Sequence, residues 1–286
     1  MINIKKEVLK MHRNCISLNI SGDVEAVPGG TRFGGMPDVP DNFEWPYFET
    51  DTFDDKEVKP RPLSFIAQFN CKEISSLDKE QLLPETGVLS FFYELDSQRW
   101  GYDPKDKGCA RVYWFDDTDK LKPFDFPKDM KEDFRLPIIG IDARSEESYP
   151  SYEDFGLNKD TETSKWIERW DEYDDAVKSL NIDDKEISHK LLGWADPIQG
   201  NMTQECELVK RGYYLGDGLD DVTPRDRQEA VDHSVRDWLL LFQLDSLGYK
   251  DFELMFGDCG RIYFYIHRDD LEKRRFDKAW VILQCC

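Results

Sequence analysis

Hydrophobic residues are concentrated in short segments that glycine, proline and polar residues separate. Leu63–Phe69, Val88–Glu94 and Ala110–Asp116 are rich in aromatic and branched side chains, and turn-forming residues flank them. This composition is typical of half-buried β-strands. A segment of the same kind, Ile16–Ile20, precedes them, and another, Leu136–Ile141, follows. The first half of the chain is therefore predicted to form a β-sheet.

Apolar residues at helical spacing predict a few helices between the strands. Thr223 at the N-cap, Pro224 at the first helical position and Asp226 in the capping-box position mark the start of one helix, which ends near Arg236. The longest predicted helix, Ser164–Leu180, combines an aromatic stripe with an acidic face. Three shorter helices are expected at Asn3–Arg13, Leu77–Leu83 and Asp269–Arg275.

The order of the predicted segments repeats along the chain. Each copy has a glycine-containing segment that ends in aspartate, a strand with a glutamine, a strand that follows a glycine, and a last strand that begins at or just after an alanine. These landmarks are Gly35 to Asp38, Gln68, Gly87 and Ala110 in the first copy, and Gly193 to Asp196, Gln243, Gly260 and Ala279 in the second. The gap from glutamine to glycine is 19 residues in the first copy and 17 in the second.

Such a unit leaves an apolar face open, and two units paired around a pseudo-twofold axis bury both faces. We therefore expect an α+β fold, internally duplicated, with mostly antiparallel sheets and a few flanking helices in a single compact body. The expected first repeat covers about residues 27–116, the insert about 117–188 and the second repeat about 189–286.

The charge of the chain restricts its partners. The formal net charge is −21, from 38 basic and 59 acidic residues in a chain of 286. Nucleic acids and anionic lipid surfaces attract basic proteins, so the charge argues against binding to either. It would attract a basic partner, although a solubilising surface explains the same charge.

Cysteine usage and hydropathy indicate the compartment. The seven cysteines form no Cys-x-x-Cys pair, no signal peptide precedes them, and no stretch approaches the ~20 apolar residues of a membrane span. A cytoplasmic protein with reduced thiols is expected.

Both copies contain segments of a known family in the same order. They are Phe33–Pro37, Gln68–Asn70, Gly87–Phe92, Leu192–Gly193, Gln243–Asp245 and Gly257–Phe264. In these segments the chain resembles the YwqG-like family of bacterial proteins of unknown function. The resemblance implies a cytosolic bacterial protein with a mixed α/β fold, and no established activity, cofactor or catalytic residues. It also suits an immunity-like or partner-binding role.

Catalytic motifs are weak. No Gly-x-Ser-x-Gly motif occurs, and the histidines are His12, His189, His233 and His267. Two enzymatic arrangements stay open: a Cys259 nucleophile beside Arg261, and a carboxylate–histidine pair of Asp196 and His189. A small cysteine in a tight turn and a satisfied histidine explain the same residues, so no catalytic residue is assigned.

Metal ligation has no support from spacing. Asp38, His189, Asp196, Gln199 and Asp258 would supply ligands if the two Gly/Pro-rich loops met, but no zinc motif is present. The acidic runs lack the glutamate spacing of a calcium loop. We expect no metal and no cofactor.

A glutamine inside an apolar strand must find hydrogen bonds, and both copies contain one. Gln68 and Gln243 either clamp a neighbouring loop or line a shared cleft. Arg32, in the glycine-rich segment Gly29–Gly35, would meet an anion there.

These observations favour a non-enzymatic protein that binds a partner or small ligand in a cleft between the repeats. The candidate binding residues are Arg32, Asp38, Gln68, His189, Asp196, Gln243, Asp258 and Cys259. Two alternatives remain: a hydrolase-like enzyme that uses Cys259 or the pair of His189 and Asp196, and an immunity-type inhibitor of a basic toxin.

Overall fold

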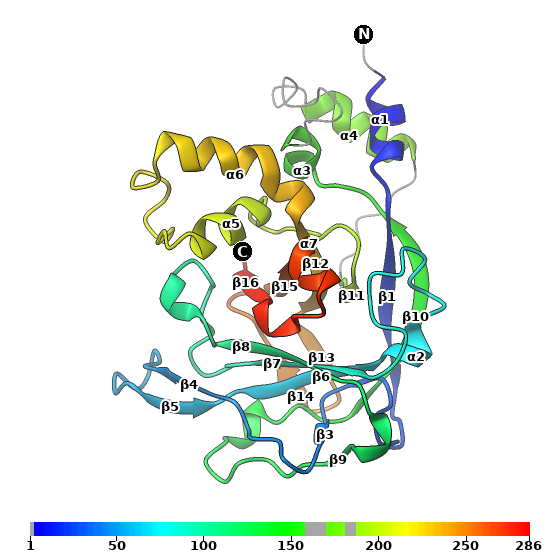
Figure 1. Cartoon of the computed structure of the whole chain (residues 1–286), viewed down its shortest axis with the longest axis vertical. Coiled ribbons are helices and arrows are strands. Elements are labelled where there is room, and N and C mark those ends of the chain that lie inside the picture. Colours follow the sequence, from blue (N-terminus) through cyan, green and yellow to red (C-terminus); the bar gives the residue numbers. More distant parts are fainter. Residues whose placement is uncertain (1–2, 158–169, 181–186) are drawn as a thin grey trace.

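One large antiparallel sheet organises the computed structural model, which describes residues 3–157, 170–180 and 187–286 (Figure 1). Its strands are β1 Arg13–Gly22, β2 Arg32–Phe33, β6 Ser64–Asn70, β7 Val88–Tyr93, β8 Ala110–Phe115, β10 Ile139–Ser148, β11 Lys190–Leu191, β12 Trp238–Asp245, β15 Arg261–His267 and β16 Trp280–Gln284. They pair in the order β16-β15-β12-β11-β1-β10-β2-β6-β7-β8. Every pairing in this sheet is antiparallel.

Small two-stranded sheets and helices surround the large sheet. The small sheets pair β3 Asp38–Val39 with β9 Lys122–Pro123, β4 Tyr47–Thr50 with β5 Lys59–Pro62, and β13 Leu247–Tyr249 with β14 Phe252–Leu254. The α-helices of the described residues are α1 Ile4–Lys10, α2 Cys71–Ile74, α3 Tyr152–Leu157, α4 Trp170–Ser179, α5 Thr203–Lys210, α6 Pro224–Asp237 and α7 Arg268–Glu272. None of them has the length and apolar character needed to cross a membrane.

The start of α6 follows its sequence signal. The Thr223 side chain accepts a hydrogen bond from the Asp226 amide at 3.1 Å, and Pro224 occupies the first turn, where a missing N–H costs nothing. This predicted helix is confirmed. The helix predicted at Ser164–Leu180 is confirmed over the range of α4, and its first six positions lie outside the described residues.

The predicted helix at Leu77–Leu83 is wrong. The Asp78 carboxylate accepts the Leu83 amide at 2.8 Å and closes a turn, while Gln81 has a φ of +55°. Both features are incompatible with a continuous helix. A short helix, α2, begins earlier, because the Asn70 side chain caps it by accepting from the Lys72 amide. The helices α3 and α5 were not predicted.

The large sheet curves so that its two ends face each other across the core. Figure 1 shows the layer of β6, β7 and β8 below that of β12, β15 and β16. Phe91 of the lower layer lies 4.8 Å from Phe242 and 5.2 Å from Phe264 of the upper layer, between ring centroids. Phe33 and Phe69 also contact Phe242. Aromatic side chains therefore fill the space between the halves, and the expected cleft between the repeats is absent there.

The strand order reads the same from the centre outwards in both directions. β1 and β10 pair in the middle, and β11 and β2, β12 and β6, β15 and β7, and β16 and β8 follow on the two sides. β6 has an irregularity between Phe65 and Ala67, and β12 has one between Leu240 and Phe242. Gln68 and Gln243 follow these irregularities at the same distance. The predicted α+β class, with mostly antiparallel strands in a single compact body, is confirmed; the repeat boundaries stay a prediction.

Helices cover the outer face of the second half. Met202 and Cys206 of α5 pack with Trp238 of β12 and Tyr263 of β15. α1, α3 and α4 form a separate apolar cluster beyond the ends of β1 and β10 (Figure 1). Helices therefore cover the outer face of the strands in the second half, and the side chains on that face are buried.

Truncation of Phe91 tests the core between the layers. Phe91 is fully buried, so Phe91→Ala should lower the free energy of unfolding by about 3–5 kcal/mol through lost burial and a residual cavity. Urea denaturation measures this change. Phe53→Ala is the control, because Phe53 is 90% exposed and should change stability by less than about 0.5 kcal/mol. A loss below about 1 kcal/mol for Phe91→Ala would contradict the described core.

Candidate functional site

Gln68 clamps the Gly/Pro-rich loop of the first half. Its carbonyl oxygen accepts the Asp38 amide at 3.0 Å, and its amide nitrogen donates to the Gly30 carbonyl at 2.9 Å and to the Asp38 carboxylate at 2.7 Å. The same carboxylate accepts the Gly29 amide and pairs with the Arg32 guanidinium at 2.8 Å. We call Arg32, Asp38 and Gln68 the first cluster.

The second half repeats this arrangement with a lysine in place of the arginine. The Gln243 carbonyl oxygen accepts the Asp196 amide at 2.9 Å, and its amide nitrogen donates to the Ser188 carbonyl at 2.8 Å and the Asp196 carboxylate at 3.0 Å. That carboxylate also accepts the Ser188 hydroxyl and pairs with Lys190 at 2.5 Å. We call Lys190, Asp196 and Gln243 the second cluster.

A tight turn brings each aspartate back over its glutamine. Leu192 and Gly193 have φ values of +61° and +75°, and Gly34 and Gly35 have +57° and +74° at the corresponding positions. A Cβ at Gly193 would lie 2.4 Å from the Ser148 hydroxyl, so only glycine fits there. In both halves the aspartate follows the basic residue by six positions, from Arg32 to Asp38 and from Lys190 to Asp196. The turn brings the chain back so that the aspartate lies beside the basic residue.

The two clusters differ in access to solvent. In the first cluster the side chains of Arg32 and Asp38 are 4% and 2% exposed. Asp38 belongs to β3, which pairs with β9, and Leu121 beside β9 is buried. In the second cluster Lys190 is 9% exposed, but Asp196 is 42% exposed. The same hydrogen-bonded arrangement is therefore sealed in one half and open in the other.

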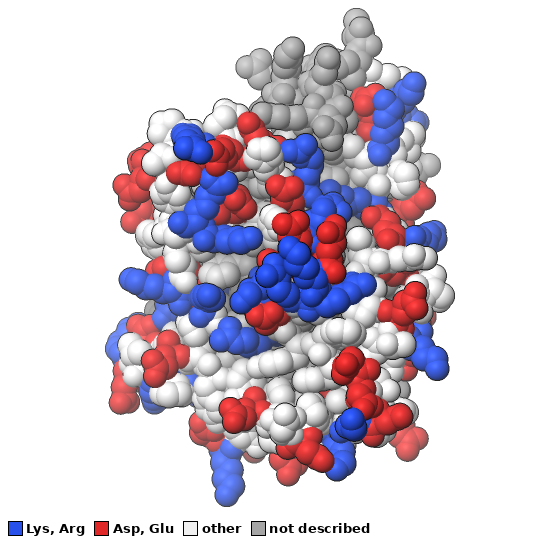
Figure 2. Space-filling view, viewed as in Figure 1, with Lys and Arg blue, Asp and Glu red and all other residues white. Residues whose placement is uncertain are grey.

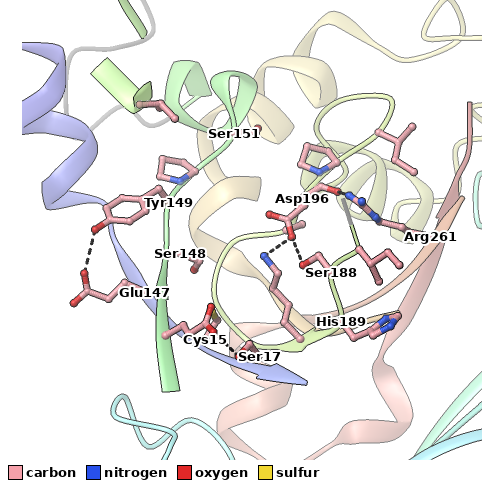
Figure 3. A pocket seen from close by; sticks show the side chains of 18 of the residues that line it. Cys15, Ser17, Glu147, Ser148, Tyr149, Ser151, Ser188, His189, Asp196 and Arg261 are labelled. Atoms are coloured by element: carbon pink, nitrogen blue, oxygen red, sulfur yellow. Dashed lines mark hydrogen bonds and ion pairs between the residues drawn. The ribbon is translucent and has the colours of Figure 1, made fainter. Parts of the chain in front are cut away.

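The open side of Asp196 faces a cavity of about 840 Å³. Figure 3 shows Asp196, Ser188 and Arg261 on one side of it and Tyr149 and Glu147 on the other. β1 and β10, the segment 149–153 that leads into α3, helix α4 and the loop 187–200 supply the lining side chains. Its volume lies within the range of small-molecule sites.

Asp196 is ionised at the edge of this cavity. Its burial raises the pKa, but the Lys190 ammonium and the hydrogen bonds from Ser188 and Gln243 outweigh this effect and lower the pKa below its usual value. The Ser188 hydroxyl donates to this carboxylate at 2.6 Å, and the lowered pKa makes the carboxylate a weak base toward it. Asp196 is therefore a negatively charged acceptor that Lys190, Ser188 and Gln243 hold in place.

His189, just before β11, also lines the cavity but has partners of its own. Its Nδ1 accepts the Asp245 amide at 3.1 Å, and its ring packs edge-on against Phe33 at 5.5 Å. Burial lowers the pKa of His189 to about 4, so the ring is neutral at neutral pH. His189 and Asp196 therefore use different partners, and no hydrogen bond joins them among the described contacts.

The remaining candidates lie elsewhere. Asp258 and Cys259 occupy the exposed turn before β15, and neither lines the cavity. The Cys259 amide donates to the Met255 sulfur, and Cys259 has a φ of +54°. The structure brings together Arg32, Asp38 and Gln68, and separately Asp196 and Gln243, with β1 and β10 between the two sets.

No group of three or more histidine, cysteine, aspartate or glutamate residues within 3–157, 170–180 and 187–286 is placed to hold a metal ion. All seven cysteines are free thiols, and only Cys259 and Cys286 are exposed.

The match to known families covers most of both halves. The model of a domain of unknown function, DUF1963, matches residues 31–285. The chain belongs to this family. No curated protein matches the sequence. The DUF1963 match includes both clusters and the residues that line the cavity from β10 onwards, whereas α1 and β1 precede it.

Sequence reasoning missed Ser188, Lys190 and the cavity itself. A signal for Lys190 was present, since the six-residue spacing from Arg32 to Asp38 recurs from Lys190 to Asp196. The cavity had no such signal, because β1, β10, α3 and α4 lie outside the repeated landmarks of the DUF1963 domain.

Matched substitutions test the difference between the clusters. Asp38→Asn should lower the free energy of unfolding by about 3–5 kcal/mol, because it leaves the buried Arg32 cation without its carboxylate. Asp196→Asn should cost less, about 1 kcal/mol, since water reaches Asp196 and the Lys190 ammonium keeps its bond to the Trp194 carbonyl. Urea denaturation of both variants measures the difference. Equal losses would contradict a sealed first cluster and an open second one.

A pH series tests the neutral state of His189. The unfolded ring binds a proton near pH 6.5 and the folded ring near pH 4, so its contribution to stability is present above pH 6.5 and is lost as the pH falls to 4. His189→Asn keeps an acceptor for the Asp245 amide but does not titrate. The stability advantage of the original chain over the variant should shrink by about 3 kcal/mol between pH 7 and pH 4. A difference that does not change with pH would refute this assignment.

Proposed function

We propose that the protein is a non-enzymatic binding protein that takes a small ligand into the cavity above the second cluster. The observation that carries the proposal is the contrast between the clusters. Both hold a loop on a strand through the same contacts, so the hydrogen bonds alone are structural. Only Asp196 combines those contacts with 42% exposure at the edge of a cavity of about 840 Å³.

The same reasoning divides the candidate residues into two roles. Gln68, Asp38 and Arg32 hold the first loop and are too buried to meet a ligand. Gln243 orients Asp196, and the remaining acceptor capacity of Asp196 faces the cavity. The proposed ligand site thus lies beside the second cluster, where β1, β10, α3 and α4 complete its lining.

A binding role explains the geometry better than a hydrolase does. The Asp196 carboxylate beside Ser188 has a lowered pKa and is a weak base, His189 is neutral and accepts from Asp245, and Cys259 stands in a separate exposed turn. A hydrolase needs a nucleophile, a base and an orienting group within hydrogen-bond reach. Among the described contacts, Ser188, His189 and Cys259 do not hydrogen-bond to one another.

The family context is part of the proposal. We assign the chain to the YwqG-like branch of DUF1963 proteins and to the bacterial cytoplasm, on the segments shared between its two copies. We also propose that the two halves of the sheet arose by internal duplication. The strand registers support this proposal. Leu191 of the second half pairs with Ile16 of β1, and Phe33, its counterpart in the first half, pairs with Ile139 of β10, so β1 and β10 take equivalent places.

A basic protein partner, such as a toxin held by an immunity-type inhibitor, is a second candidate because of the net charge of −21. The charge is unevenly distributed. Figure 2 shows lysine and arginine side chains gathered in the middle of one face, at the place of α7 in Figure 1. Arg268, Lys273, Arg275 and Lys278 are exposed in this segment. A basic partner would therefore approach a different face.

Ligand-observed NMR with a mixed library of anionic, neutral and cationic small molecules tests the proposed site. At least one compound should bind the full chain, and Asp196→Asn should weaken it by about tenfold or more through the lost acceptor. Asp217→Asn makes the same charge change at an exposed position outside the cavity and is the control. If no compound binds, or if both variants weaken binding equally, the proposal fails.

A further inference from the structure

The lining of the cavity indicates the charge of its ligand. We infer that the cavity binds an organic cation with ammonium or guanidinium groups, and this inference rests on the proposed binding function. Two independent features support it: a wall of aromatic rings on the side of α3 and α4, and an excess of carboxylates over free basic groups.

The aromatic wall consists of Tyr152, Trp170 and Tyr173. The ring of Tyr152 lies 4.9 Å from that of Trp170 and 5.5 Å from that of Tyr173, and Trp170 lies 6.1 Å from Tyr173. All three line the cavity, and Trp170 is 53% exposed. The π-face of an aromatic ring attracts a cation, and tryptophan does so most strongly. Exposure of Trp170 leaves such a surface accessible.

Carboxylates outnumber basic side chains around the same cavity. Among the described residues, the acidic side chains of the lining are Glu146, Glu147, Glu153, Asp174 and Asp196, and the basic ones are Lys190 and Arg261. Asp174 pairs with Lys178 at 2.6 Å and Asp196 with Lys190, so Glu146, Glu147 and Glu153 carry the excess of negative charge. Both basic side chains are already engaged, Lys190 with Asp196 and Arg261 with Asp245 at 2.6 Å. They therefore contribute little positive potential to the open space.

Two of the carboxylates are exposed and available to a ligand. Glu147 accepts the Tyr149 hydroxyl at 3.1 Å, and neither Glu147 nor Glu153 has a lysine or arginine partner in the described parts of the chain. Both lie close in sequence to Tyr149 and Tyr152, so charge and aromatic surface occur on the same side of the cavity. This combination attracts a cation and repels an anion.

The size of the cavity fits a small amine of several carbons. About 840 Å³ accommodates an extended alkyl diamine together with water. The same ammonium chemistry is found in free diamines and polyamines and in the lysine side chains of a basic protein. We assign the site to a free small amine, and a lysine-containing peptide serves to distinguish the second source.

Isothermal titration calorimetry of the full chain with three probes of equal length tests the inference. The probes are pentane-1,5-diammonium, pentane-1,5-diol and pentanedioate. The diammonium should bind at least about tenfold more tightly than the diol, and the dianion should not bind. An acetylated, amidated Gly-Lys-Gly peptide should bind more weakly than the diammonium; tighter binding of the peptide would overturn the assignment to a free amine.

Variants localise the effect. The double variant Glu147→Gln/Glu153→Gln should weaken the diammonium by about tenfold, and Trp170→Ala should weaken it by about threefold to tenfold. Glu57→Gln/Glu253→Gln removes the same charge from exposed positions outside the cavity and should leave binding unchanged. Equal weakening by the two double variants would show attraction to the net charge of the protein and would overturn the site.

The outcomes separate this inference from the proposed function. If the diol or the dianion binds as well as the diammonium, and Asp196→Asn weakens it, the cavity is a ligand site but the cation inference is wrong. If the diammonium does not bind while an anionic or neutral library compound does, the inference fails alone. If neither the three probes nor any library compound binds, both fail.

Discussion

A glutamine amide that is buried in a β-strand must satisfy its donors and acceptor, and in this protein that requirement fixes a loop in each half of the sheet. Gln68 and Gln243 are both fully buried, and each exchanges hydrogen bonds with an aspartate that follows a tight turn. This clamp holds the turn in place beside the short strands β2 and β11. These two strands in turn connect β6 to β10 and β12 to β1 in the sheet. Loss of the glutamine would leave several buried polar groups without partners.

The residues around each clamp determine how far its aspartate is exposed to solvent. In the first half β3 pairs with β9, and the ion pair of Arg32 and Asp38 is sealed. In the second half a lysine replaces the arginine, and the aspartate opens to a cavity that the central strands, α3 and α4 help to form. A structural device thus presents a fixed carboxylate to solvent in one half only. In our proposal, the neighbouring aromatic rings and glutamates set which ligand charge the cavity favours.

Local sequence signals predicted the strands and the capped helix α6 well, because their causes are local. Glycine before β7 and β15, aromatic and branched residues within them, and Thr223 with Pro224 act over a few residues. Leu77–Leu83 was misjudged because its apolar spacing resembles a helix, while the contact of Asp78 with Leu83 closes a turn.

The site itself was only partly predictable from the sequence. The equivalence of Gln68 with Gln243 and of Asp38 with Asp196 followed from the repeated order of landmarks, but the difference in their exposure did not. That difference depends on β9, α3 and α4, which are distant in sequence from the clusters. Phe91, Phe242 and Phe264 meet across the core and fill the space between these strands, and the cavity lies instead over the central strands β1 and β10.

The central claim is that an organic cation binds over the second cluster and not the first. Titration of the full chain with pentane-1,5-diammonium, followed through the side-chain amide NMR signals of Gln68 and Gln243, tests it most directly. We expect the Gln243 signals to shift until the binding site is saturated with the diammonium, while the Gln68 signals stay in place. Equal shifts at both glutamines, or no shift at either, would contradict the account.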